Sequence, residues 1–256
     1  LSGSHEVDRL RIGMYQRYYG GNMDEGWTRL LLERFGFPYK SIMDDEIRAG
    51  ELNDSYDTII LPADGVARMT GDQPPGGGNN FGRRPEDYPP KYRSGFGKEG
   101  VDALEAFVDD GGTLITFAQA GALPIEKFKL PVRNVVANVS SRKFWSPGST
   151  LRVDVDNTNP LAYGMPDEAL ATFLGGNQVY QVIPSPWNDQ IERVITFKDR
   201  DILQSGWLLG EDVIAKKAAM VSVRHGSGKV VLIGFRAQHR VQTHGTFKLV
   251  FNALIK

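Results

Sequence analysis

The first quarter of the chain divides into short segments, each with its own pattern of apolar and polar positions. Apolar and polar residues alternate one by one at 10–15, and an amphipathic stretch follows at 24–36. Residues 38–43 suit a short strand and residues 44–50 a helical turn. Residues 58–63 (TIILPA) form an uninterrupted apolar run, which is typical of a strand covered on both faces. Strands and helices that alternate at this spacing predict a parallel sheet with crossover helices.

The segment at 24–36 predicts a helix whose start and buried face can be assigned. Asp24 is expected to cap its first turn, because a short polar side chain can accept a hydrogen bond from an unpaired backbone N–H. Trp27, Leu30 and Leu31 are expected to form its inner face.

Residues 64–97 break this pattern. They contain DQPPGGGNNFGRRPEDYPP, and such a density of proline and glycine argues against a regular element. A long segment of this kind within a compact domain is usually a functional flap or a disordered insertion, and the sequence favours neither. A helix at 99–110 and a fourth buried strand at 113–118 (TLITFA) resume the pattern.

The second half of the chain is richer in strands. Residues 134–217 form a β-rich section punctuated by proline and glycine, and residues 218–223 and 229–235 predict a hairpin. Gly234 in the last strand predicts the close approach of another backbone. A polar segment then leads into a terminal amphipathic helix. We therefore expect one α/β domain over residues 1–256, with a mostly parallel sheet, helices on both faces and a β-rich elaboration.

Composition narrows the classes of function. The chain has 256 residues, a formal net charge of −1 and no cysteine. The charge gives no reason to expect nucleic acid as a partner, and the lack of cysteine excludes disulfides and thiolate nucleophiles. No apolar run approaches the roughly 20 residues of a membrane span. The opening residues 1–6 (LSGSHE) resemble a cloning remnant or a cut within a longer protein.

No catalytic motif is complete. The turn after residues 113–118 is where related α/β folds hold a nucleophile, and alignment on Gly121 places Gln119 there. Glutamine cannot attack a carbonyl, and the chain has no G-x-S-x-G motif, so a plain strand-to-helix connection is favoured. His239 and His244 are five residues apart and do not share a helix face, so we expect no metal site and no cofactor.

A polar cluster between the last strand and the last helix has two interpretations. It could bind an anion at the start of the helix, or it could pair with carboxylates at the ends of neighbouring strands as a structural network. The structural network is favoured. The candidate pocket residues are Asp24, Glu25, Asp64, Gln119, Arg236, His239, Arg240 and His244.

Several segments together resemble a known family. YQRYYGGNMDEGWTRLLLERFGFPY, FVDDGGTLITF, WSPGSTLRVDVDNTNPLAYGMP and GKVVLIGFRAQHRVQTHGTFKLVFNAL are similar to the C-terminal region of large bacterial exported proteins that carry a zinc carboxypeptidase-like domain. The resemblance implies a flavodoxin-like, class I glutamine amidotransferase-like fold. It also implies periplasmic or extracellular export and an adjoining peptidase domain as partner. The zinc-ligand motif and the amidotransferase cysteine are both absent from this chain.

Two functional hypotheses follow. The first is a non-catalytic accessory domain, a pseudoenzyme that binds a peptide, a cell-envelope component or the adjoining peptidase domain. The second is a cryptic hydrolase in which His239 or His244 acts as general base on a water held by Asp24, Glu25 or Asp64. Among the aromatic residues, we expect core or interface roles rather than a carbohydrate platform for Trp145, Trp187 and Trp207.

Overall fold

A mixed β-sheet forms the centre of the computed structural model, which describes residues 10–18, 21–72, 87, 89–93, 95–183 and 190–255. Its parallel part has the strand order β2-β1-β3-β4-β12, in which the chain starts in the middle and reverses direction between β1 and β3. This is the order of flavodoxin-like doubly wound sheets. The parallel strands are β1 (Ile12–Tyr15), β2 (Lys40–Ile42), β3 (Thr58–Leu61), β4 (Thr113–Phe117) and β12 (Gly228–Ile233).

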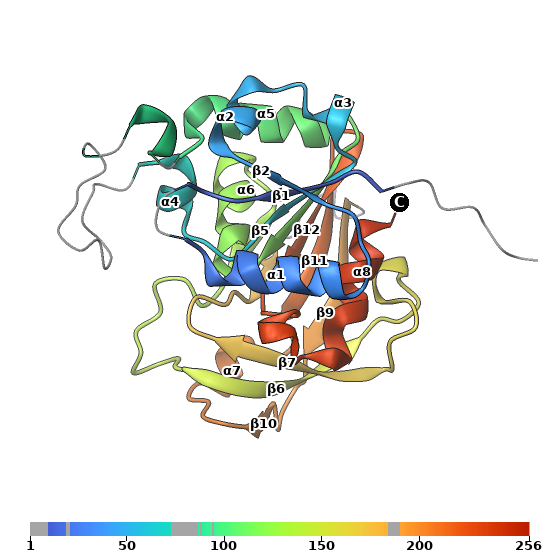
Figure 1. The fold of residues 1–256 in the computed structure, drawn as a ribbon. Coiled ribbons are helices and arrows are strands. Elements are labelled where there is room, and N and C mark those ends of the chain that lie inside the picture. Colours follow the sequence, from blue (N-terminus) through green and yellow to red (C-terminus); the bar gives the residue numbers. More distant parts are fainter. Residues whose placement is uncertain are drawn as a thin grey trace, which may run out of the picture.

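Helices cover both faces of this parallel part (Figure 1). One face carries α1 (Met23–Arg34) and α8 (Phe247–Leu254), and the buried side chains of these helices share one core cluster. The other face carries α2 (Asp44–Ala49), α3 (Leu52–Ser55), α4 (Val66–Thr70), α5 (Gly97–Asp109) and α6 (Ala122–Lys127), which contribute to a second cluster.

The β-rich section extends the same sheet with antiparallel strands. β11 (Ala218–His225) forms a hairpin with β12 and continues the sheet through β9 (Ile191–Phe197) to β6 (Gly148–Val155). Figure 1 shows β6, the outermost of these strands, below α1. The remaining elements are β5 (Val132–Asn134), β7 (Glu168–Leu174), β8 (Tyr180–Val182), β10 (Leu203–Ser205), α7 (Glu211–Ile214) and several short 3-10 helices.

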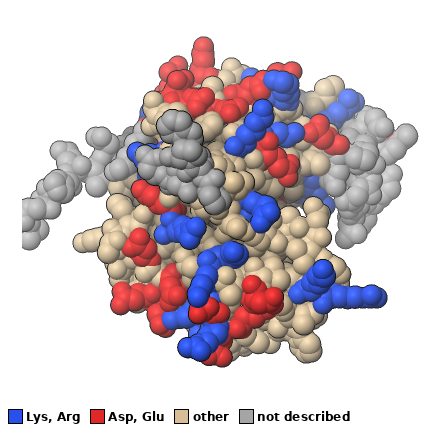
Figure 2. Space-filling view, turned by 180° about the vertical axis from the view of Figure 1, so that it is seen from behind, with Lys and Arg blue, Asp and Glu red and all other residues tan. Residues whose placement is uncertain are grey.

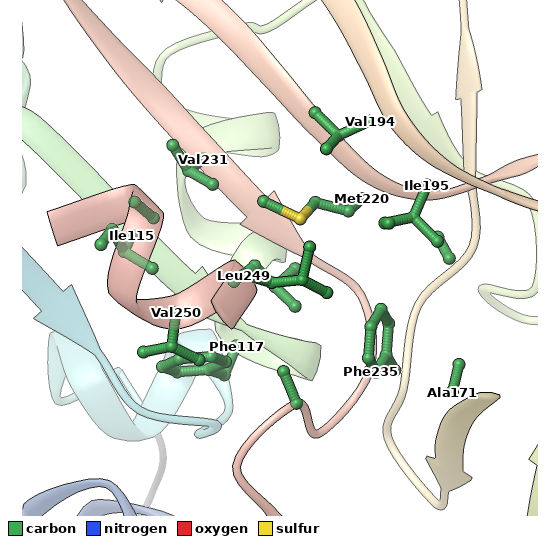
Figure 3. Packing of buried hydrophobic residues seen from close by; sticks show 14 of the residues in the cluster. Ile115, Phe117, Ala171, Val194, Ile195, Met220, Val231, Phe235, Leu249 and Val250 are labelled. Atoms are coloured by element: carbon green, nitrogen blue, oxygen red, sulfur yellow. The ribbon is translucent and has the colours of Figure 1, made fainter. Parts of the chain in front are cut away.

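The terminal helix closes the core over the parallel strands. Figure 3 shows Val250 of α8 beside Phe117 of β4, with Leu249 between that strand and Phe235. These side chains are all at most 1% exposed. Burial of this kind contributes about 1.5–3 kcal/mol for each large apolar side chain. A helix as short as α8 is not stable by itself, so packing against the sheet is what stabilises it.

The predicted buried strands, the hairpin and the terminal helix are confirmed, and so is the predicted role of Gly234. Its backbone N–H donates to Ala219 at 2.8 Å, and its carbonyl accepts from Gln178 at 2.7 Å. A Cβ at position 234 would lie 2.3 Å from the Gln178 carbonyl oxygen. The close backbone approach therefore requires glycine.

Two predictions for α1 are wrong. The capping side chain is that of Asn22, which accepts from the Asp24 backbone N–H at 3.0 Å. Leu30 is 49% exposed, because the face turned to the sheet is that of Thr28, Leu31 and Leu32. Because α1 has apolar residues on more than one face, the periodicity of its sequence does not show which face is buried.

The segment at 64–97 is more regular than expected at its start, because α4 forms there. Its two ends lie side by side: the Phe96 backbone N–H donates to the Met69 carbonyl at 2.9 Å. The side chain of Asp44 accepts from the Gly95 backbone N–H at 2.9 Å and holds this junction to α2. The flap and insertion interpretations concern residues 73–86, 88 and 94, which lie outside the described residues.

Candidate functional site

The carboxyl edge of the parallel strands is where ligands bind in open α/β sheets, especially where the strand order reverses. Here that reversal lies between β1 and β3. Arg17, which follows β1, forms an ion pair with Asp64, which follows β3, with 2.6 Å between Nε and Oδ2. Both side chains are almost fully buried. The predicted pocket residue Asp64 is therefore paired with Arg17, which was not among the predicted pocket residues.

A second buried ion pair joins α1 to the segment after β12. Arg236 donates from Nε to Asp24 Oδ1 at 2.9 Å, and from Nη1 to Asn177 Oδ1 at 2.6 Å and to the Gly175 carbonyl at 3.1 Å. The Arg236 residue is only 9% exposed. Its guanidinium thus fastens three segments that are far apart in the sequence. This arrangement corresponds to the structural network rather than to an open anion site.

Burial raises the pKa values of Asp24, Glu25 and Asp64 above the ordinary range for carboxyl groups. Cations oppose this effect in each case: Arg236 for Asp24, Arg29 for Glu25 and Arg17 for Asp64. A raised carboxyl pKa is also found in catalytic acids, but Asp64 and Asp24 are paired with arginines at 2.6 and 2.9 Å. Glu25 Oε1 is buried 3.7 Å from Arg29 and accepts no hydrogen bond from a described residue.

The turn after β4 retains an unusual backbone. Ala118 has φ of +47°, is fully buried and begins a 3-10 helix that continues to Gly121. A left-handed residue that directly follows a buried strand is the conformation of a nucleophile elbow. The strained position is thus Ala118 and not Gln119, one residue earlier than expected. Its methyl side chain has no nucleophilic atom.

Gln119 lies against a loop that crosses the carboxyl end of β4. A Cβ on Gly176 would lie 2.0 Å from the Gln119 Oε1 atom, and Gly176 has φ of +82°. Glycine is therefore favoured at position 176 by its left-handed backbone, whereas the long Gln119 side chain can move to make room for a methyl group. The loop also provides Asn177 to Arg236, so it covers the edge at two neighbouring strands.

His239 is the most unusual titratable residue at this edge. Its ring contacts Trp27 edge to face, with 4.9 Å between centroids, and its Nδ1 is buried without a hydrogen-bond partner. Burial lowers its pKa, and the positive charge of Arg236 lowers it further. The next two residues, Arg240 and Val241, have φ of +50° and +54°. A left-handed valine is a rare, strained conformation.

The remaining candidates do not join this group. His244 is exposed and contacts Phe247, and Arg240 is exposed. Neither His239 nor His244 forms an ion pair with a carboxylate among the described residues. Glu25 lies 3.7 Å from Arg29 on the same helix. In the part of the chain that the structure describes, no group of three or more His, Cys, Asp or Glu side chains could hold a metal ion.

Sequence reasoning missed Arg17, Asn177 and Gly176. Arg17 directly follows the first strand, so its position in the predicted topology was a usable signal. Asn177 and Gly176 belong to the β-rich section, whose placement over the carboxyl edge cannot be deduced from local pattern. No helix in the described residues is long and apolar enough to span a membrane.

A scan of family models and a search of curated proteins gave no match. Solved structures are similar over nearly the whole chain. PurLQS from Thermotoga maritima matches 96% of this chain and 98% of its own, with a TM-score of 0.58 and 17% identity. A ThuA-like protein from Bacteroides uniformis matches 98% of this chain and 92% of its own, with a TM-score of 0.55 and 12% identity.

The fold is glutamine amidotransferase-like. A β-galactosidase from Bacillus circulans is similar over 97% of this chain but only 32% of its own, with a TM-score of 0.53 and 11% identity. At these identities the similarities establish the amidotransferase-like fold alone. They show that the fold occurs both as a nearly complete chain and as a part of a longer enzyme chain. Activity must be argued from the residues at the carboxyl edge.

Proposed function

We propose that this amidotransferase-like chain is a non-catalytic accessory domain that binds a partner or ligand. The observation that carries the proposal is the buried alanine at the elbow after β4. Ala118 keeps the left-handed backbone of a nucleophile position but offers only a methyl group. Acyl transfer on this fold needs a nucleophile at that turn.

The charges around the elbow support the same conclusion. Asp64 is paired with Arg17, and Asp24 with Arg236. A general base must lie within hydrogen-bond reach of the proton that it removes, directly or through one water, and it is oriented by a third group. The carboxylates that could orient a histidine are instead bound to arginines. These two carboxylates are therefore not placed to orient a general base.

The parent protein is also part of the proposal. On the sequence resemblance, this chain belongs to an exported zinc carboxypeptidase-like protein, its nearest partner is the peptidase domain, and its ligand is a peptide or a cell-envelope component. The complete reading frame tests this directly. It should contain a signal peptide and an upstream domain with His and Glu zinc ligands. A frame that lacks both would refute the proposed parent.

One observation favours the hydrolase as a second candidate. His239 is kept neutral by burial, has an unpaired Nδ1 and precedes two strained residues, and strain of this kind gathers at functional sites. As a base, it would act on a water molecule without an acyl-enzyme. This candidate requires that His239 be essential for turnover.

The deciding experiment is a hydrolysis screen with ester, amide and glutamine substrates. We expect no turnover above the buffer blank for the wild-type protein, and the same result for His239→Ala. The matched control is His225→Ala. His225 pairs with Gly228 at the start of β12, away from the carboxyl edge, and its ring stacks on Phe128. Turnover that His239→Ala removes and His225→Ala retains would overturn the non-catalytic assignment.

A further inference from the structure

Two tryptophans lie on the surface of the β-rich section. Trp145 is 44% exposed and Trp207 is 61% exposed, and their ring centroids are 6.0 Å apart. The sequence favoured core or interface roles over a carbohydrate platform, and the core role is wrong for both. Trp187, the third tryptophan of that prediction, lies outside the described residues. Leu209, beside the exposed pair, is 43% exposed. Large aromatic side chains left in water at one point of a surface indicate a binding site.

The backbone holds this pair rigidly. Trp145 and Leu209 exchange two backbone hydrogen bonds, at 3.1 and 2.9 Å. The Ser149 hydroxyl donates to the Trp207 carbonyl at 2.5 Å and accepts from the Trp207 backbone N–H at 3.1 Å. Gly206 has φ of +95°, and a Cβ there would lie 2.5 Å from the Gly148 carbonyl. The two backbone segments that carry the indoles are therefore held together, which lowers the entropic cost of bringing both rings to one ligand.

The geometry of the rings defines the shape of a ligand. The indole planes meet at 70°, so the two rings form a T-shaped pair in which the second ring is nearly perpendicular to the face of the first. An indole N–H is a hydrogen-bond donor, and no hydrogen bond joins either one to a described residue. Arg142 and Lys143 are exposed and precede Trp145 by three and two residues, so cationic donors are close to the pair in the sequence. The site thus combines an apolar face with donors around it.

The size of the patch limits the class of partner. The two indoles leave about 260 Å² in water, taking roughly 250 Å² for a fully exposed tryptophan side chain. A stable protein–protein interface needs about 800 Å² on each partner. The patch is therefore too small to hold a folded protein by itself, but it suits a small ligand that has one apolar face and many hydroxyl groups.

We propose that Trp145 and Trp207 form a carbohydrate-binding site. A pyranose ring has a face of C–H groups that stacks on an indole, and its hydroxyl oxygens accept hydrogen bonds at its rim. The second indole and the cationic side chains supply those donors, and their charge adds affinity for sugars that carry a carboxylate. The site lies on the β-rich section, so the proposal holds whether or not the carboxyl edge is catalytic.

Fluorescence titration and calorimetry test the proposal. The probes are cellohexaose, xylohexaose, chitohexaose and tetragalacturonate at concentrations up to the millimolar range. We expect at least one probe to change tryptophan emission saturably in the wild-type protein. Trp145→Ala and Trp207→Ala should each weaken that binding at least tenfold, as measured by calorimetry. Both variants should remain folded by circular dichroism, and Trp207→Ala should lose less thermal stability than Trp145→Ala, because Trp207 is the more exposed of the two.

The matched control is Tyr163→Ala, which removes an aromatic side chain that is 76% exposed outside the pair. It should bind the same probe with unchanged affinity. The proposal is overturned if no probe binds, or if the tryptophan variants bind as tightly as the wild-type protein. It is also overturned if either tryptophan variant converts a wild-type oligomer to a monomer in light scattering, because the pair would then be a contact between copies of this chain.

Discussion

The buried ion pair between Arg236 and Asp24 makes the structural interpretation of the carboxyl edge measurable. Arg236→Met keeps much of the side-chain volume but removes the charge, and it leaves the Asp24 carboxylate without its partner. Asn177 and Gly175 lose a donor as well. Loss of one partner of a buried ion pair costs about 3–5 kcal/mol in free energy of unfolding. For a chain of this length that corresponds to a fall of about 10 °C in thermal midpoint.

A double-mutant cycle measures the interaction itself. Arg236→Met, Asp24→Asn and the double variant are compared by urea unfolding with linear extrapolation. The double variant removes both charges together, so it should be more stable than the sum of the single changes predicts, by about 1–3 kcal/mol. The matched control is Lys98→Met, which breaks an exposed pair with Asp102 and should leave the urea midpoint unchanged.

The cost of Arg236→Met should also depend on pH. Without the guanidinium, nothing in this pair opposes the effect of burial, and the pKa of Asp24 rises further. A carboxyl whose folded pKa lies above its unfolded value contributes stability at low pH and loses it as pH rises. The variant should therefore be closer to the wild-type protein at pH 5 than at pH 7. A loss below about 1 kcal/mol, or strict additivity in the cycle, would refute the structural role and revive the ligand pocket.

Three further predictions follow from single positions. Burial raises the pKa of Asp44, so the free energy of unfolding of the wild-type protein, relative to that of Asp44→Asn, should fall as pH rises above about 4. Urea unfolding at several pH values measures this difference, and a constant difference would contradict the prediction. Ala118→Gly relieves a left-handed alanine and should change the free energy of unfolding by less than about 1 kcal/mol, whereas the control Ala120→Gly should cost about 1–2 kcal/mol. Gly176→Ala should lower stability by about 1–2 kcal/mol by calorimetry, while Gly175→Ala, whose Cβ meets nothing within 4 Å, should be neutral.

Local pattern was enough for most of the secondary structure. The apolar runs that became β3 and β4 are buried on both faces, so they carry a strong signal, and the hairpin of β11 and β12 is marked by a glycine-containing turn. The parallel order of the first strands followed from their alternation with helices. The sequence also determined what the chain lacks: with no cysteine, it has no thiolate at the elbow.

Only the tertiary structure decided which polar residues meet. Asp24 and Arg236 are 212 positions apart, and Asn177 completes their cluster from the β-rich section. Periodicity could not choose between the two apolar faces of α1, and it could not show that Trp145 and Trp207 stay in water. The physical reason is the same in each case. Pairing and exposure depend on segments that are distant along the chain, while a pattern reports only on the neighbours of each residue.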